Sequence, residues 1–105
     1  MADRFQPLYL ISVVAKLLEV HPQTLRMYER QGFIRPTRRG HIRLYCDADI
    51  ERLQQIQRFK DEMGVNLAGI EVILHMLDRM EEMQKEVDEI RERAKRRLTK
   101  LSEDR

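Results

Sequence analysis

The sequence predicts a mostly helical protein, with a small N-terminal domain of short elements and a long C-terminal helix. Three observations predict this fold class. Charged residues make up 36% of the 105 residues and aromatic residues only 6%, a composition typical of helices with long solvated faces. Apolar residues recur at helical spacing through much of the chain. From Ile73 onward the repeat becomes seven residues, as in a coiled coil.

Two short helices are predicted near the start of the chain, after an extended entry over residues 8–11. Ser12 is a candidate N-cap for the first helix, which ends near Glu19. Pro22 suits the first turn of a second helix, because no N–H is needed there, and Gly32 ends that helix. A helix, a tight turn and a second helix form a DNA-binding arrangement whose second helix enters the major groove.

The second predicted helix, within HPQTLRMYERQG, has a polar side and an apolar side. It is too short to be stable alone in water, so its apolar side, with Leu25 and Tyr28, must pack on the domain. Its polar side carries Arg and Gln, which pair with guanine and adenine. An ordinary solvated face is the alternative, and the turn before it and the basic hairpin after it disfavour that. We predict that this helix contacts DNA through Gln23, Thr24, Arg26, Met27, Tyr28 and Arg30.

These predicted contacts differ in kind. Gln23, Thr24 and Arg26 are assigned to base edges or nearby phosphates, and Arg30 to the DNA backbone. The Tyr28 ring is expected in the core, with its hydroxyl directed to a phosphate.

A hairpin, here called the wing (about residues 34–45), is predicted next. Ile42 and Leu44 alternate with polar neighbours, which indicates a strand, and the turn falls at Arg39–Gly40. The first strand lies within FIRP, where Pro36 restricts it to a brief or edge position. A helix-turn-helix followed by such a hairpin predicts a winged helix-turn-helix domain.

The wing is strongly basic, and its cationic residues are Arg38, Arg39 and Arg43. Like charges crowded at a turn repel one another unless an anion lies among them, and DNA phosphate is the natural anion. The alternative for one of them, with Arg43 as the candidate, is an ion pair with Glu29 or Asp47. Tyr45 is a further candidate DNA contact, although a place in the core is an equal alternative.

Two more helices are predicted after the wing. Asp47 is a candidate N-cap for the third, which runs to Gly64 and has the apolar residues Ile50, Leu53, Ile56 and Phe59. Asn66 is the candidate cap of the fourth, whose apolar stripe starts with Leu67, Ile70, Ile73 and Leu74.

The fourth helix continues into a seven-residue repeat that predicts a dimerisation coiled coil. The predicted contact residues are Ile73, Met76, Leu77, Met80, Met83, Val87, Ile90 and Ala94. Core packing explains the methionines better than a ligand-binding groove. Arg97 interrupts the apolar positions, so pairing is expected to fade there and residues 95–105 to fray. We therefore predict a DNA-binding domain over 1–75 and a dimerisation helix with its tail over 76–105.

Charge is divided unevenly between these parts. Through Tyr45 there are eight basic and three acidic residues, and after it twelve basic and fifteen acidic. Seven of the first eight are arginine, which suits contacts to phosphate and guanine. A polyanion-binding head on a separate assembly module is the interpretation that this pattern favours.

Several other classes are disfavoured. Cys46 is the only cysteine, and its lone presence fits a reducing cytoplasm. No apolar run approaches the roughly 20 residues of a membrane span, and the N-terminus does not resemble a signal peptide. The histidines and Cys46 are too scattered for a metal site, and no nucleophile is matched to a base. We expect a cytoplasmic protein with no cofactor, no metal and no enzymatic activity.

Two stretches carry a family resemblance. IS-V-V-A-K-L-L-x-V-x-P-Q-T-L-R-x-Y-E-R-x-G, followed by P-T-R…R-L-Y-x-D-A-D-I-x-R-L, resembles the DNA-binding domain of the MerR family of bacterial transcription regulators over residues 9 to about 75. HPQTLR together with E-x-G-V-N-L-A-G-I at 62–70 is most similar to the heat-shock repressor subfamily, HspR. The chain departs from the family pattern at Met27, where an aromatic residue is frequent, and in its tighter wing, RRGHIRLY.

The resemblance implies a winged helix-turn-helix domain, a homodimer built on an antiparallel coiled coil, and an inverted-repeat DNA operator. For the heat-shock subfamily it implies repression of chaperone operons, with the chaperone DnaK as co-repressor, in the bacterial cytoplasm at the nucleoid. Two alternatives stay open. One is an activator that untwists a promoter spacer for RNA polymerase, and the other is a coiled-coil chaperone adaptor with an incidental basic head.

Overall fold

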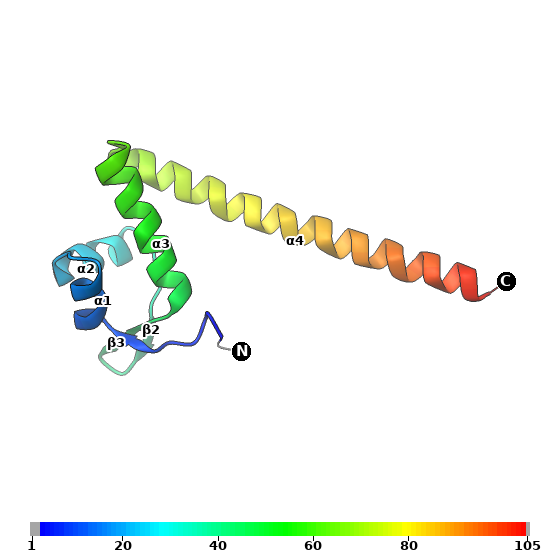
Figure 1. Ribbon diagram of the computed structural model, residues 1–105, viewed down its shortest axis with the longest axis horizontal. Helices are drawn as coiled ribbons and strands as arrows, with labels where there is room; N and C mark the ends of the chain where they lie inside the picture. Colours follow the sequence, from blue (N-terminus) through cyan, green and yellow to red (C-terminus); the bar gives the residue numbers. More distant parts are fainter. Residues whose placement is uncertain (1–2, 105) are drawn as a thin grey trace. The chain divides into compact units, whose positions relative to one another are not determined.

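The computed structural model describes residues 3–104 and confirms the mostly helical fold (Figure 1). The elements in chain order are β1 (Tyr9–Leu10), α1 (Ile11–Leu17), α2 (Pro22–Arg30), β2 (Thr37–Arg39), β3 (Ile42–Tyr45), α3 (Asp47–Gln57), the π-helical turn η1 (Arg58–Glu62) and α4 (Leu67–Glu103). The chain divides into two compact units, Met1–Ile70 and Glu71–Arg105. The outer ends of the two predicted domains, residues 1, 2 and 105, lie outside the described residues.

Local signals explain the bounds of α2. The Nδ1 atom of His21 accepts a hydrogen bond from the backbone N–H of Gln23 at 3.0 Å, so His21 caps the helix. Pro22 occupies the first turn, as predicted. Gly32, with a φ of 79°, follows in the left-handed region that glycine adopts without strain. The sequence therefore fixes both ends of this nine-residue helix.

The start of α1 differs from the prediction. The helix begins at Ile11 with Leu10 as N-cap and no side-chain cap, so the assignment of Ser12 as N-cap is wrong. Leu10 is already held in β1, which orients the backbone for the helix without a side-chain acceptor. At the other end, the Gln57 side chain donates to the carbonyl of Leu18 at 2.8 Å and pairs one of the last carbonyls of α1.

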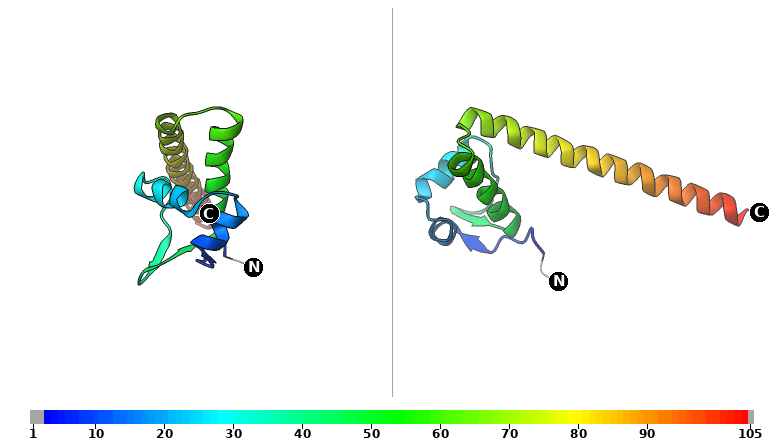
Figure 2. Two further views of the ribbon diagram at one scale, coloured as in Figure 1. Left: turned by 90° about the vertical axis from the view of Figure 1, so that its left-hand side faces the viewer. Right: turned by 45° about the horizontal axis from the view of Figure 1, so that its top comes forward.

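The wing belongs to a three-stranded antiparallel sheet with strand order β1-β3-β2. The predicted position of its first strand is wrong. The strand is Thr37–Arg39 and not FIRP, because Phe33 and Ile34 are buried in the core and Pro36 lacks the N–H that a ladder needs. The turn residues are Gly40 and His41, since Arg39 pairs with Ile42. In the left view of Figure 2 the β2–β3 hairpin extends away from the helices of its unit.

Capping also explains where α3 begins, although the capping residue differs from the predicted one. The predicted cap Asp47 is the first residue of the helix, and the N-cap is Cys46. Asp49 closes this end, because its carboxylate accepts the Cys46 N–H at 3.0 Å. The helix passes into η1, a π-helical turn that the sequence pattern does not predict, and Gly64 follows with a φ of 65°.

A small apolar core holds the first unit together. Its fully buried side chains come from α1, α2, β3, α3 and the first turn of α4, and they are Val14, Leu25, Tyr45, Leu53, Ile56 and Ile70. Burial of this kind is the dominant stabilising term in a domain of this size, worth about 1.5–3 kcal/mol for each large side chain. The short helices are therefore held by the core that they share.

The last helix, α4, is 37 residues long, or about 55 Å at 1.5 Å per residue. Asn66 caps it as predicted, because its Oδ1 accepts the N–H of Gly69 at 2.8 Å. The expectation that residues 95–105 fray is wrong for the described part, since the helix continues to Glu103. Ion pairs at helical spacing, such as Lys95 with Glu92 at 3.7 Å, lie along this stretch.

Candidate nucleic-acid interface

The two sides of α2 differ in exposure as the sequence predicts. Leu25 and Tyr28 are buried, and the Tyr28 ring stacks on Phe33 with 5.8 Å between ring centroids. Gln23 and Arg30 are exposed, while Thr24, Arg26 and Met27 are half-buried. The helix is thus docked by one side and leaves a polar side with two guanidinium groups toward solvent.

Three of the predicted DNA-contacting arginines are uncommitted within the first unit. Arg26, Arg30 and Arg39 form no ion pair with any residue from 3 to 104. A guanidinium carries five N–H donors, so each of these groups is able to bind a phosphate or a base edge without giving up a protein partner.

The other two wing arginines are joined to α2 by one carboxylate. Arg38 Nη2 donates to Oε1 of Glu29 at 2.8 Å, and Arg43 Nε donates to Oε2 of Glu29 at 2.6 Å. The alternative of an Arg43–Glu29 ion pair is therefore confirmed, and Arg38 shares the same partner. The interaction links the C-terminal half of α2 to both strands of the wing.

The charge state of Glu29 fits this role. Partial burial opposes its ionisation, but the hydrogen bonds and positive charges of Arg43 and Arg38 outweigh it and hold its pKa below the ordinary value of 4.5. Glu29 is thus a carboxylate at neutral pH. From the sequence, Glu29 is only one possible ion-pair partner of Arg43. The signal that points to it is the crowding of three arginines in the wing, which calls for a nearby carboxylate.

Tyr45 lies in the core, which is the alternative that the sequence left open beside a DNA contact. Its side chain is fully buried, and its hydroxyl has no hydrogen-bond partner among residues 3–104. Burial, followed by the nearby negative charge of Glu29, raises the pKa of Tyr45 to about 12. Because the side chain of Tyr45 is 0% exposed, it offers no atom to a phosphate at the surface of the chain. Tyr28 is also buried, so any DNA contact from it is limited to its hydroxyl.

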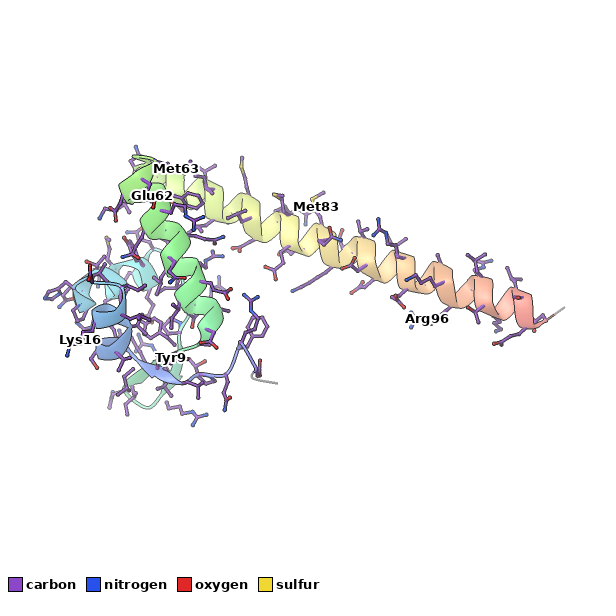
Figure 3. The ribbon with its side chains drawn as sticks, viewed as in Figure 1. Tyr9, Lys16, Glu62, Met63, Met83 and Arg96 are labelled. Carbon is purple, nitrogen blue, oxygen red and sulfur yellow. The ribbon has the colours of Figure 1, made fainter. Side chains whose placement is uncertain are left out.

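The predicted dimerisation residues lie along α4, where most of them are exposed in the single chain. Met76, Met80, Met83, Val87 and Ile90 are large apolar side chains open to solvent, and Ala94 is exposed as well. Ile73 and Leu77 are half-buried. Figure 3 shows Met83 standing out from the helix. The exposed members, from Met76 to Ala94, form an apolar row that the chain itself leaves uncovered.

Two other classes of site are absent from the described residues, a membrane-spanning helix and a metal-binding cluster. No helix there is long and apolar enough to cross a membrane. No group of three or more His, Cys, Asp or Glu in residues 3–104 is placed to hold a metal ion.

Comparisons with known proteins agree with this geometry. Residues 9–77 match the family model "MerR HTH family regulatory protein". Over 85 residues the chain is 44% identical to the heat shock protein HspR of Streptomyces coelicolor, which covers 80% of the chain and 56% of that relative. It is 33% identical over 102 residues to the HTH-type transcriptional regulator GlnR of Bacillus cereus, covering 96% and 78%. The chain thus spans only about half the length of its HspR relative.

Solved structures agree on the fold. HiNmlR, a MerR family regulator lacking the sensor domain and bound to promoter DNA, has a TM-score of 0.60 at 22% identity, covering 90% of this chain and 75% of that one. A MerR family transcriptional regulator from Bacillus cereus has a TM-score of 0.57 at 28% identity, covering 90% and 78%.

Proposed function

The chain belongs to the MerR family of helix-turn-helix regulatory proteins, and from that premise we propose that it is a homodimeric repressor of heat-shock and chaperone genes that binds an inverted-repeat operator. The observation that carries DNA binding is the exposed side of α2, where Arg26 and Arg30 have no ion-pair partner within residues 3–104. The wing adds Arg39, which is exposed at the end of β2. In such an arrangement the second helix enters the major groove and the wing holds the backbone.

The proposed target genes and the proposed co-repressor are inferred from the similarity of this chain to HspR. The 44% identity to HspR supports a heat-shock regulon, and the same resemblance supports DnaK as co-repressor. Heat offers a second route to regulation, because a small dimer of modest stability loses its folded, DNA-binding fraction on warming. Operator affinity that stays unchanged well above the growth temperature, with no chaperone added, would count against this thermal route.

Pairing through α4 supports the inverted repeat. An antiparallel pair with Ile73 opposite Ile90 of the second copy also places Met80 opposite Met83 and Val87 opposite Met76, so every layer is apolar. A shift of this register by one heptad in one direction would place Arg97 opposite Ile73 and bury a charge, and a shift in the other direction would place Asn66 opposite Ile90. We therefore propose the first register for the dimer.

A disulfide cross-link tests this register. In a Cys46→Ser background, the double variant Ile73→Cys with Ile90→Cys is expected to form a covalent dimer under mild oxidation, while each single variant stays uncross-linked. A parallel pair would instead place each residue against its own copy, so efficient cross-linking of the single variants would refute the antiparallel arrangement.

Substitution of the two free arginines of α2 tests DNA binding itself. Arg26→Ala with Arg30→Ala should lower affinity for a selected inverted repeat by about 100-fold or more, since each well-placed contact gives about 1–3 kcal/mol. The dimer should remain intact by sedimentation. Arg58→Ala with Arg96→Ala removes the same charge from exposed positions outside α2 and the wing, and is the matched control. An adaptor would keep its partner binding, and any weak DNA binding, in both variants.

The second candidate function is activation by untwisting a promoter spacer, which other members of the MerR family perform. The position of a footprint separates the two. A repressor is expected across the start site, and an activator between the −35 and −10 elements.

A further inference from the structure

We propose that Glu29 is a positioning residue that fixes the wing relative to α2 and thereby sets the sequence specificity of DNA binding. The proposal rests on the proposed function, because it assigns Glu29 a role within the same interface. Glu29 touches no DNA in this proposal and acts through Arg38 and Arg43.

The geometry gives one carboxylate two separate tasks. Each oxygen of Glu29 accepts from a different arginine, one on β2 and one on β3. Arg38 and Arg43 are direct partners in the strand register, and like charges placed opposite each other destabilise a hairpin. The carboxylate relieves this repulsion and ties both strands to the helix that carries Arg26 and Arg30.

The exposed fractions of the three side chains show which of them is still able to contact DNA. The side chains of Glu29 and Arg43 are 18% and 22% exposed, while that of Arg38 is 51% exposed. Arg43 is thus mainly a structural partner. Arg38 keeps further N–H donors in solvent, so it is able to bind a phosphate while still held by Glu29.

Loss of the Glu29 interaction is expected to lower the sequence specificity of DNA binding more than the non-specific affinity for DNA. Phosphate contacts from a wing fix the register of the recognition helix in the groove. A wing that is free to move still attracts DNA but no longer holds Arg26 at one base pair. Removal of the Glu29 charge also makes each subunit more positive, which strengthens non-specific binding.

The test compares Glu29→Gln with the intact chain, at one fixed salt concentration, on a selected inverted repeat and on a scrambled duplex. Glu29→Gln should lower the ratio of the two affinities by about tenfold or more, with non-specific affinity unchanged or higher. Glu51→Gln is the matched control, because it removes a carboxylate that pairs with Arg4 at 2.7 Å on an exposed surface. Its ratio should stay within about twofold of the intact chain.

A second variant, Arg43→Lys, tests the same interaction in case Glu29→Gln does not fold. Arg43→Lys keeps the positive charge but loses the Nε donor, and it should also lower the ratio. An unchanged ratio in both variants, or an equal loss of both affinities in variants that are folded by circular dichroism, would overturn the proposal. An intact chain that prefers no inverted repeat would instead refute the proposed function, and this proposal with it.

Discussion

The apolar sides of α2 and α4 are treated in opposite ways by the chain. Leu25 and Tyr28 on α2 are buried inside the first unit. On α4, Met76 and Met80 remain 61% and 64% exposed, and Met83, Val87 and Ile90 are exposed with them. Both helices are amphipathic, yet α2 buries its apolar side within the chain, whereas α4 buries apolar side chains only near its start, at Ile70 and Leu74.

The two helices therefore depend on different parts of the molecule for their stability. A helix of nine residues is marginal in water and depends on the core for its structure. The 37-residue helix has its own ladder of hydrogen bonds, so its apolar row is available for a second copy. We expect substitutions on the two apolar sides to have different consequences, one for folding and the other for assembly.

The largest expected effect comes from charging the apolar row of α4. Met80→Glu with Met83→Glu should abolish dimerisation, because each pair would bury carboxylates without a partner. Affinity for an inverted repeat should fall by about 100-fold or more, since the second half-site loses its effective concentration. Sedimentation and DNA titration measure the two results.

Lys85→Glu is the matched control for that variant. It makes the same change in net charge at a side chain that is 72% exposed, so the dimer should persist. A dimer that survives Met80→Glu with Met83→Glu would show that the pairing surface lies elsewhere.

A smaller effect is expected from opening the core beneath α2. Leu25→Ala should lower the free energy of unfolding by about 2–5 kcal/mol, because the side chain is fully buried and leaves a cavity. Denaturant titration measures this value. Gln23→Ala, on the exposed side of the same helix, should change it by less than about 0.5 kcal/mol. Equal costs at the two positions would contradict the docking of α2 by its apolar side.

The smallest effect is expected at Tyr45. Tyr45→Phe removes a buried hydroxyl that has no partner in residues 3–104, so stability should stay the same or rise by up to about 1 kcal/mol. DNA affinity should not change, because the side chain has no exposed surface. A tenfold loss of affinity in a folded Tyr45→Phe variant would restore the phosphate contact that the sequence pattern left open.

The sequence predicts the elements whose signals are local. Pro22 and Gly32 bound α2, Asn66 caps α4, and the seven-residue repeat marks the apolar row. Each of these depends on residues a few positions apart, where backbone chemistry decides the outcome.

The features that the sequence does not predict depend on distant residues. The pairing of β1 with β3 joins Tyr9 to Tyr45, and a strand of two residues carries no periodicity of its own. The alternation of Ile42 and Leu44 with polar neighbours places Tyr45 on the polar side of β3, yet its side chain is fully buried. The two hydrogen bonds of Glu29, to Arg38 and Arg43, form only when both wing strands lie beside α2.

The central claim is that the two α2 helices of a dimer enter two successive major grooves, and the most direct test of it is a change in the spacing of the two half-sites. The intact chain is titrated onto a selected inverted repeat and onto the same repeat with 5 base pairs inserted at its centre. If two copies of α2 are held one helical repeat apart by α4, the insertion turns one half-site to the opposite side of the duplex and affinity should fall by about 100-fold. Equal affinity for both duplexes would contradict a fixed dimer that reads two successive major grooves.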